Sequence, residues 1–136
     1  MNSHSEHQQA RLAEWHRVVF AQDYAALSAL LAPDVQFRSP FFWKAKTGAA
    51  IAAAILTAAT TVFDDFTYHR EWLDGNDWAL EFSAQVGELS VKGIDLIRWD
   101  DAGRIVDFEV LVRPANGLQA LGMAMAAKLA EMGVSL

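Results

Sequence analysis

Apolar and polar positions follow two different periods along the chain, and the period changes near residue 66. Before that point, Leu12, Trp15 and Val19 recur at intervals of three and four, which predicts an amphipathic helix over residues 8–21. Asp23 is a suitable N-cap for a second, short helix. The N-terminal half is therefore expected to begin with two helices.

One strand and one further helix are expected before the change of period. Residues 35–39 alternate between apolar and polar, as a strand does, and Pro40 ends the alternation. A third helix is expected over residues 47–60, because its many alanines favour helix formation. Thr47 is the expected N-cap of this helix.

After residue 66 the period is two, which predicts strands separated by turns rich in Asp, Asn and Gly. This order predicts one α+β domain over residues 1–136, with an antiparallel sheet packed against the N-terminal helices. A polar, flexible tail is expected at residues 1–7, and an extra C-terminal helix follows the sheet. The expected strands are residues 67–73, 78–86, 89–99 and 105–112, and the final helix is residues 117–132.

Composition narrows the possible partners. The 136 residues are 53% hydrophobic and 21% charged, the balance of a globular domain. A net charge of −6 without any basic cluster argues against a nucleic acid and against an anionic membrane surface. The absence of cysteine excludes disulfides, thiolate metal sites and cysteine nucleophiles.

Targeting and cofactor signals are also missing from the sequence. The polar N-terminus lacks the apolar segment of a signal peptide, and the longest uncharged run, residues 47–63, is shorter than the ~20 residues of a membrane span. A cytoplasmic protein is therefore expected. No metal and no organic cofactor is expected, because the histidines are scattered and no glycine-rich phosphate loop follows a strand.

Alternation along the predicted strands places one carboxyl among apolar side chains. Lys92 and Arg98 mark one face of the strand at residues 89–99, which puts Asp95 on the other face. Burial raises the pKa of such a carboxyl because it disfavours the ionised form, and groups of this kind are enriched at functional sites. Asp95 could instead be structural, for example as the acceptor for the indole N–H of Trp15.

A pocket is expected on the same face of the sheet, with His69 as a weaker acid–base candidate beside Asp95. The pair would require His69 to point inward, which alternation in its strand does not settle; a surface position is the alternative. Aromatic side chains at helix and strand spacing are also common in plain cores. The expected pocket residues are Trp15, Phe37, Ser39, Trp43, Phe82, Val91, Phe108 and Val110.

Two segments, residues 22–40 and 93–106, resemble SnoaL-like proteins of the nuclear-transport-factor-2-like (NTF2-like) superfamily, which includes ketosteroid isomerase and the polyketide cyclases. The resemblance implies a cone-shaped fold, in which a strongly curved antiparallel sheet and the helices enclose a mostly apolar pocket. It also implies a homodimer formed through the outer face of the sheet. Ile94 and Leu96, opposite Asp95 on their strand, agree with that expectation.

The resemblance to ketosteroid isomerase extends to one of three catalytic positions. Asp95 falls where that enzyme has a neutral aspartic acid in its oxyanion hole. Trp15 falls at the position of the partner tyrosine, and Ser39 falls at the position of the aspartate that removes the proton. Serine is not a base at neutral pH without an activating partner, so isomerisation by that mechanism is not expected.

Three classes of function remain open from the sequence. The first is an acid–base enzyme of isomerase, cyclase or dehydratase type that acts on a small hydrophobic carbonyl or polycyclic compound. The second is a binding module that holds a small apolar ligand without changing it. The third is an interaction domain whose cavity is closed by side chains. An open cavity around Asp95 favours the first two classes, and a titrating partner for Asp95 favours the first.

Overall fold

The computed structural model describes residues 6–135 and consists of four helices and one six-stranded sheet. Three helices and two strands form the first half of the chain, and four consecutive strands followed by one helix form the second. In chain order they are α1 (Glu6–Ala21), α2 (Tyr24–Leu30), β1 (Leu31–Arg38), β2 (Lys46–Thr47), α3 (Ala49–Val62), β3 (Asp64–Asp74), β4 (Asp77–Val86), β5 (Leu89–Trp99), β6 (Ile105–Arg113) and α4 (Ala115–Glu131).

The sheet has the strand order β2-β1-β6-β5-β4-β3. Strands β3 to β6 form an antiparallel meander, as the turn signals predict, and β2 is antiparallel to β1. The pairing of β1 with β6 is parallel, so the sheet is mixed, and the expectation of a wholly antiparallel sheet is wrong at this one pairing. Alternation identifies a strand but not its partner, and these two strands are far apart in the sequence.

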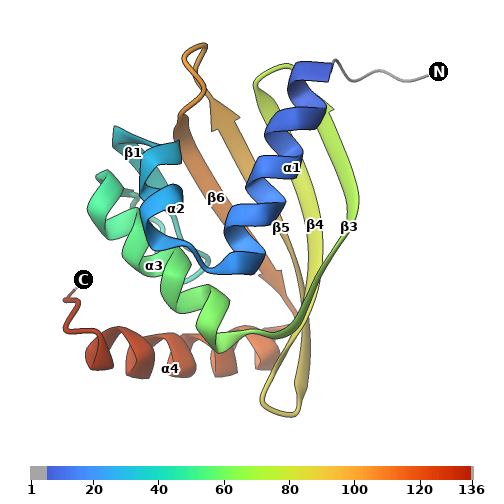
Figure 1. Cartoon of the computed structure of the whole chain (residues 1–136). Helices are drawn as coiled ribbons and strands as arrows, with labels where there is room; N and C mark the ends of the chain where they lie inside the picture. Colours follow the sequence, from blue (N-terminus) through green and yellow to red (C-terminus); the bar gives the residue numbers. More distant parts are fainter. Residues whose placement is uncertain (1–5, 136) are drawn as a thin grey trace.

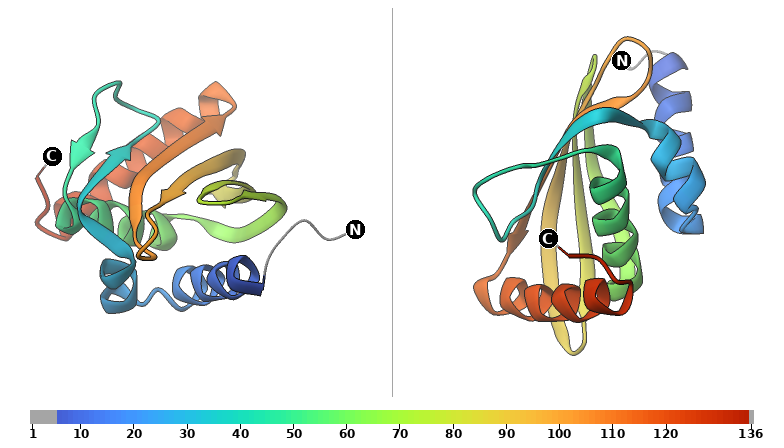
Figure 2. Two further views of the ribbon diagram at one scale, coloured as in Figure 1. Left: turned by 90° about the horizontal axis from the view of Figure 1, so that it is seen from above. Right: turned by 90° about the vertical axis from the view of Figure 1, so that its left-hand side faces the viewer.

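Helices α1, α2 and α3 cover one face of the curved sheet, and α4 crosses its lower end (Figure 1; Figure 2, right). Large apolar side chains from the helices and the sheet meet there, and their removal from water drives the packing of the two layers. The α+β fold class is therefore confirmed. The largest fully buried side chains are Trp15, Val18, Val35, Leu80, Phe82, Ile105 and Phe108.

Two helix starts differ from the sequence expectation. Helix α1 already begins at Glu6, so Glu6 and His7 are helical, and the rest of the expected tail, residues 1–5, lies outside the described residues. Thr47 belongs to β2, and Gly48 is the N-cap of α3. Gly48 has φ of 124°, a backbone conformation that favours glycine over every other residue. The expected cap of α2 is confirmed: Asp23 accepts a hydrogen bond from the Ala26 N–H at 3.1 Å.

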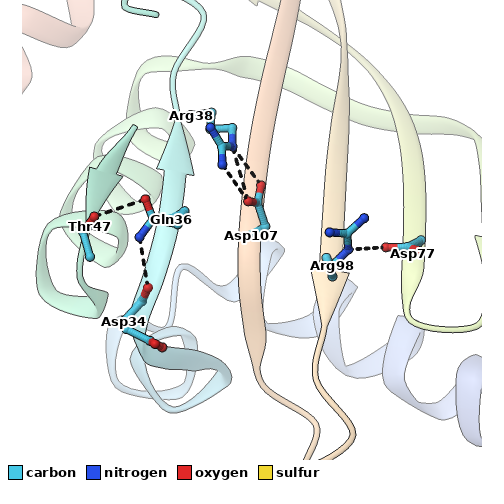
Figure 3. A network of polar contacts seen from close by, with 7 residues as sticks. All are labelled: Asp34, Gln36, Arg38, Thr47, Asp77, Arg98 and Asp107. Carbon is cyan, nitrogen blue, oxygen red and sulfur yellow. Dashed lines mark hydrogen bonds and ion pairs between the residues drawn. The ribbon is translucent and has the colours of Figure 1, made fainter. Parts of the chain in front are cut away.

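The outer face of the sheet, away from α1–α3, carries ion pairs that join neighbouring strands. Arg38 on β1 bonds Asp107 on β6 at 3.1 Å, and Arg98 on β5 bonds Asp77 on β4 at 2.8 Å (Figure 3). Each pair joins opposite charges on adjacent strands, the arrangement that stabilises cross-strand contacts. The outer face is therefore largely charge-balanced, whereas the inner face is apolar.

Gly93 on β5 is a point where the inner face tolerates no side chain. A Cβ atom at this position would lie 2.4 Å from the backbone oxygen of Leu111 and 2.5 Å from the Phe82 ring. We therefore expect Gly93→Ala to lower the free energy of unfolding by about 1–3 kcal/mol, the usual cost of overpacking a core. Urea unfolding monitored by tryptophan fluorescence measures this change.

Gly122 on α4 supplies the matched control. A Cβ atom there would lie 3.1 Å from the Phe41 ring, which is a side chain that can shift, and alanine favours a helix interior more than glycine does. Gly122→Ala should therefore leave the stability unchanged or raise it. Equal stability of the Gly93→Ala variant and the unmodified protein would contradict the packing described for β5.

Candidate functional site

Asp95 lies near the middle of β5 on the inner face of the sheet. Leu80 on β4 and Val110 on β6 are its partners on the neighbouring strands. The residue is only 6% exposed, and it is one of two buried polar or charged residues within the described part of the chain. A carboxyl is thus held among apolar side chains where alternation along the sequence predicts it.

Tyr68 is the hydrogen-bonding partner of this carboxyl. The Tyr68 hydroxyl donates to Asp95 Oδ2 at 2.8 Å, and the indole Nε1–H of Trp15 donates to the Tyr68 hydroxyl oxygen at 3.1 Å. A chain of two hydrogen bonds therefore runs from α1 through β3 to β5. Trp15 reaches Asp95 only through Tyr68, so the sequence-based pairing of the Trp15 indole directly with Asp95 is wrong.

Burial has the largest effect on the pKa of Asp95. Loss of hydration raises the pKa of the Asp95 carboxyl to about 7, and the hydrogen bond from Tyr68 opposes part of that rise because it favours the carboxylate. Burial and the nearby Asp95 charge raise the pKa of Tyr68 well above its usual value. At neutral pH, Asp95 is therefore present in both protonation states, while Tyr68 remains a donor.

A cavity of about 310 Å³ lies between the sheet and the helices, and Asp95 and Tyr68 line it. Its wall is otherwise mostly apolar, and its size lies within the range of small-molecule sites in proteins. Several residues expected in a pocket share this cavity with Asp95. They are Trp15, Phe37, Ser39, Phe82, Phe108 and Val110.

Two expected pocket residues lie elsewhere. Trp43 is 98% exposed in the loop between β1 and β2, so the prediction that it lines the pocket beside Asp95 is wrong. Loop residues have no periodicity from which a direction could be predicted. Val91 is buried on the inner face, but it packs close to Gly117 of α4 and does not line the cavity.

His69 is exposed on the outer face, where its Nε2 lies 2.6 Å from the Ser83 hydroxyl. The proposed pairing of His69 with Asp95 is therefore wrong. His69 follows the inward-facing Tyr68 and so faces outward, as alternation requires. A β-bulge lies just beyond it, where the register of β3 against β4 shifts between Tyr68 and Glu71. Tyr68 pairs with Phe82 and Glu71 pairs with Leu80, so both face inward although they are three residues apart.

Ser39 has no activating partner in this cavity. Its hydroxyl accepts a hydrogen bond from the backbone N–H of Phe41 at 3.3 Å, and no histidine or carboxylate within residues 6–135 bonds to it. The other carboxylate of the described residues that lines the cavity is Asp23, which is occupied as the cap of α2. Asp95 is therefore the carboxyl that this cavity offers for proton transfer.

Metal and membrane features are not found within residues 6–135. No group of three or more His, Cys, Asp or Glu side chains in this range is arranged to hold a metal ion. In the same range, no helix has the length and apolar character needed to cross a membrane.

Solved structures of NTF2-like proteins share this fold. A steroid delta-isomerase from Pseudomonas aeruginosa is 50% identical, with a TM-score of 0.89 over 97% of this chain and 98% of that one. An uncharacterised protein with a cystatin-like fold from Silicibacter pomeroyi is 42% identical, with a TM-score of 0.84 over 88% and 85% of the two chains. An NTF2-like protein of unknown function from Mesorhizobium loti is 21% identical over 84% and 97%, with a TM-score of 0.71, and supports the fold alone.

The model of the SnoaL-like domain family matches residues 12–108, which include Trp15, Tyr68 and Asp95. The chain therefore belongs to the SnoaL-like domain family, as the resemblance of its two sequence segments predicts. No protein with a curated description matches the chain.

Proposed function

We propose that this protein is an acid–base enzyme of the isomerase type that moves a proton on a small, largely apolar carbonyl compound. Asp95 transfers the proton, and Tyr68 donates a hydrogen bond to the oxygen of the substrate. The observation that supports this most strongly is the isolated carboxyl, with its pKa raised to about 7, facing an otherwise apolar cavity with a tyrosine hydroxyl 2.8 Å away. A general acid–base group works best when its pKa is near the working pH.

The proposed reaction moves one proton from one carbon of the substrate to another and needs no other reactant. Ionised Asp95 takes a proton from the carbon next to the carbonyl, and the electron pair of the C–H bond forms an enolate. The Tyr68 hydroxyl turns from Asp95 to the enolate oxygen, where a preorganised donor stabilises the negative charge. Protonated Asp95 then returns the proton to a different carbon of the enolate, which moves the double bond and restores the carboxylate.

The comparison with the Pseudomonas protein supports an isomerase. That relative is described as a steroid delta-isomerase, is 50% identical and covers almost the whole chain. Ser39 stands at the position where the resemblance places the catalytic base, so the proposal assigns proton removal to Asp95. The resulting mechanism needs one carboxyl, which removes and returns the same proton.

A panel of β,γ-unsaturated ketones of increasing size tests the proposal. The protein should convert at least one of them into the conjugated ketone, whose ultraviolet absorbance reports the reaction. In D₂O the converted ketone should carry little deuterium, because Asp95 returns the proton that it removed to a different carbon of the same compound. Rates for the whole panel that equal those of an Asp95→Asn variant would contradict the proposal.

Binding without chemistry is the second candidate, and two hydrogen bonds of the cavity favour it. The Asp95 carboxylate already accepts a hydrogen bond from Tyr68, and the Ser39 hydroxyl is bonded to the backbone. A pure binding module would take up 2-naphthol, a flat apolar molecule with one hydroxyl, yet leave every ketone of the panel unchanged. Titration of 2-naphthol fluorescence alongside the ketone assay distinguishes the two functions.

We further expect a homodimer formed through the outer face of the sheet. Trp72, Leu96 and Leu111 are 49%, 38% and 46% exposed there, and Ile94 is partly exposed between them. The flanking ion pairs are each formed within one chain, so they add no net charge beside this apolar surface (Figure 3). Light scattering should give twice the 15.0 kDa of one chain, and a mass of 15.0 kDa at micromolar concentration would contradict the dimer.

A further inference from the structure

A second pair of polar side chains lies beside Tyr68, outside the hydrogen-bond chain that reaches Asp95. His16 Nε2 lies 2.6 Å from Glu71 Oε2, with the two side chains 33% and 19% exposed. The imidazole ring of His16 also stacks on the Tyr68 ring, with 5.3 Å between the ring centroids and 26° between the planes. The pair joins helix α1 to strand β3, against the ring whose hydroxyl faces Asp95.

The bulge in β3 is what makes this pair possible. With strict alternation after Tyr68, residue 71 would face outward, away from α1. The shifted register instead pairs Glu71 with Leu80, which is fully buried on the inner face. Bulges are frequent beside functional sites, where they redirect a side chain, and this one brings Glu71 within reach of His16.

Two consecutive residues of α1 contact Tyr68, one at its hydroxyl and the other at its ring. Trp15 bonds the hydroxyl oxygen, and His16 covers the ring. Phe66 and Phe20 meet the Tyr68 ring edge-on, with centroids 5.0 and 6.2 Å away. The phenylalanines contact the ring at its edge, and the imidazole contacts its face. The imidazole is itself tied to Glu71 by a 2.6 Å hydrogen bond, so this contact joins the ring to a second polar group.

We propose that His16 and Glu71 are positioning residues for the acid–base site, which fix the Tyr68 ring so that its hydroxyl points at the carboxyl of Asp95. The proposal rests on the proposed function of the Tyr68–Asp95 pair and extends it to two residues outside the hydrogen-bond chain. Both act through Tyr68. Neither takes part in proton transfer.

The ionisation of Asp95 reports the position of the Tyr68 hydroxyl. That hydroxyl stabilises the carboxylate, so a poorly aimed hydroxyl leaves the pKa of Asp95 higher. The titratable groups that face Tyr68 are His16 from α1, Glu71 from its own strand and Asp95 from β5. Loss of the His16–Glu71 bond should therefore be measurable at Asp95, although neither residue is bonded to it.

The experiment is a ¹³C NMR titration of the Asp95 carboxyl in the full chain and its variants. His16→Phe keeps a ring against Tyr68 but loses the hydrogen bond to Glu71, and Glu71→Ala loses the same bond. We expect either variant to raise the titration midpoint of Asp95 by up to about one pH unit, as a weakened hydrogen bond to the carboxylate does. Glu71→Gln keeps an acceptor for His16 and should restore the midpoint. Glu14→Gln is the matched control, because it removes an exposed pair with Arg17 on the same helix.

The outcomes separate the inference from the function on which it rests. A midpoint that is the same in His16→Phe, Glu71→Ala and the unmodified chain would overturn the inference, as would an equal shift in Glu14→Gln. If His16→Phe does not fold, His16→Gln replaces it, because glutamine removes the stacked ring with a smaller change of volume. A midpoint near 4 in the unmodified chain instead refutes the proposed acid–base role of Asp95 itself.

Discussion

Replacing Asp95 by asparagine should stabilise the folded protein at pH 8 while it removes the proton-transfer group. The carboxyl has a pKa of about 7 in the folded chain, against an ordinary value of 3.8. Below pH 3.8 the carboxyl is protonated in the folded and in the unfolded chain, so its ionisation does not affect the free energy of unfolding. Between these values the unfolded chain loses its proton first, so the stability of the folded chain falls as the pH rises. The pKa difference corresponds to about 4 kcal/mol at pH 8.

Asparagine has the size of aspartate, can accept the Tyr68 hydrogen bond and does not ionise. The stability advantage of Asp95→Asn over the unmodified chain should therefore be small at pH 4 and grow to about 4 kcal/mol at pH 8. Urea unfolding across this pH range measures it. Asp34→Asn, at an exposed position on β1, is the matched control and should show no such growth. An advantage that is constant with pH would contradict the buried, raised-pKa carboxyl.

The same substitution should remove most of the proposed activity. Loss of a general acid–base group lowers rates by about 100- to 10,000-fold. Gain of stability together with loss of turnover is the expected sign of a group kept for function at a cost to the fold. A variant that is less stable and equally active would assign Asp95 a structural role instead.

Tyr68→Phe should have the second largest effect on the site. It removes the donor to Asp95, which raises the pKa of that carboxyl further, and it leaves the Trp15 indole without its acceptor. An unsatisfied buried donor costs about 1–3 kcal/mol. Loss of the donor to the enolate oxygen should slow turnover by about 100- to 1,000-fold. Unfolding and ketone assays on one preparation measure both effects.

Tyr24→Phe is the control for this prediction, because Tyr24 is the other of the two tyrosines and is 47% exposed at the start of α2. It should behave like the unmodified chain in both assays. If Tyr68→Phe lowered stability but left turnover unchanged, the hydroxyl would serve only the fold. Unchanged stability and unchanged turnover would contradict the hydrogen-bond chain altogether.

Much of the fold could be predicted from local patterns. The strand at residues 89–99 matches β5 residue for residue, and Asp23 is the N-cap of α2 as expected. What local patterns do not contain is pairing over long distances. The parallel contact of β1 with β6 depends on how the whole sheet closes, which alternation within either strand does not specify.

The position of Asp95 in the candidate site could be predicted from the sequence, but the side chains that contact it could not. Lys92 and Arg98 fix the face of β5, because this strand alternates without interruption through Asp95. The bulge in β3 adds one residue, so Tyr68 and Glu71 both face inward, and a single alternation along the strand could not settle the face of His69. The buried indole of Trp15 and the carboxyl of Asp95 both need a hydrogen-bonding partner, and the sequence left open whether they bond each other or share a third polar side chain such as Tyr68.

The most direct test of this account is a ¹³C NMR titration of the Asp95 carboxyl in the unmodified protein. The assignment follows from the one carboxyl signal that disappears in Asp95→Asn. Burial in the apolar cavity predicts a midpoint at about pH 7, with the hydrogen bond from Tyr68 limiting the rise. A midpoint near the ordinary value of 3.8 would show that the carboxyl is hydrated and fully ionised at neutral pH, and would contradict the proposed acid–base site.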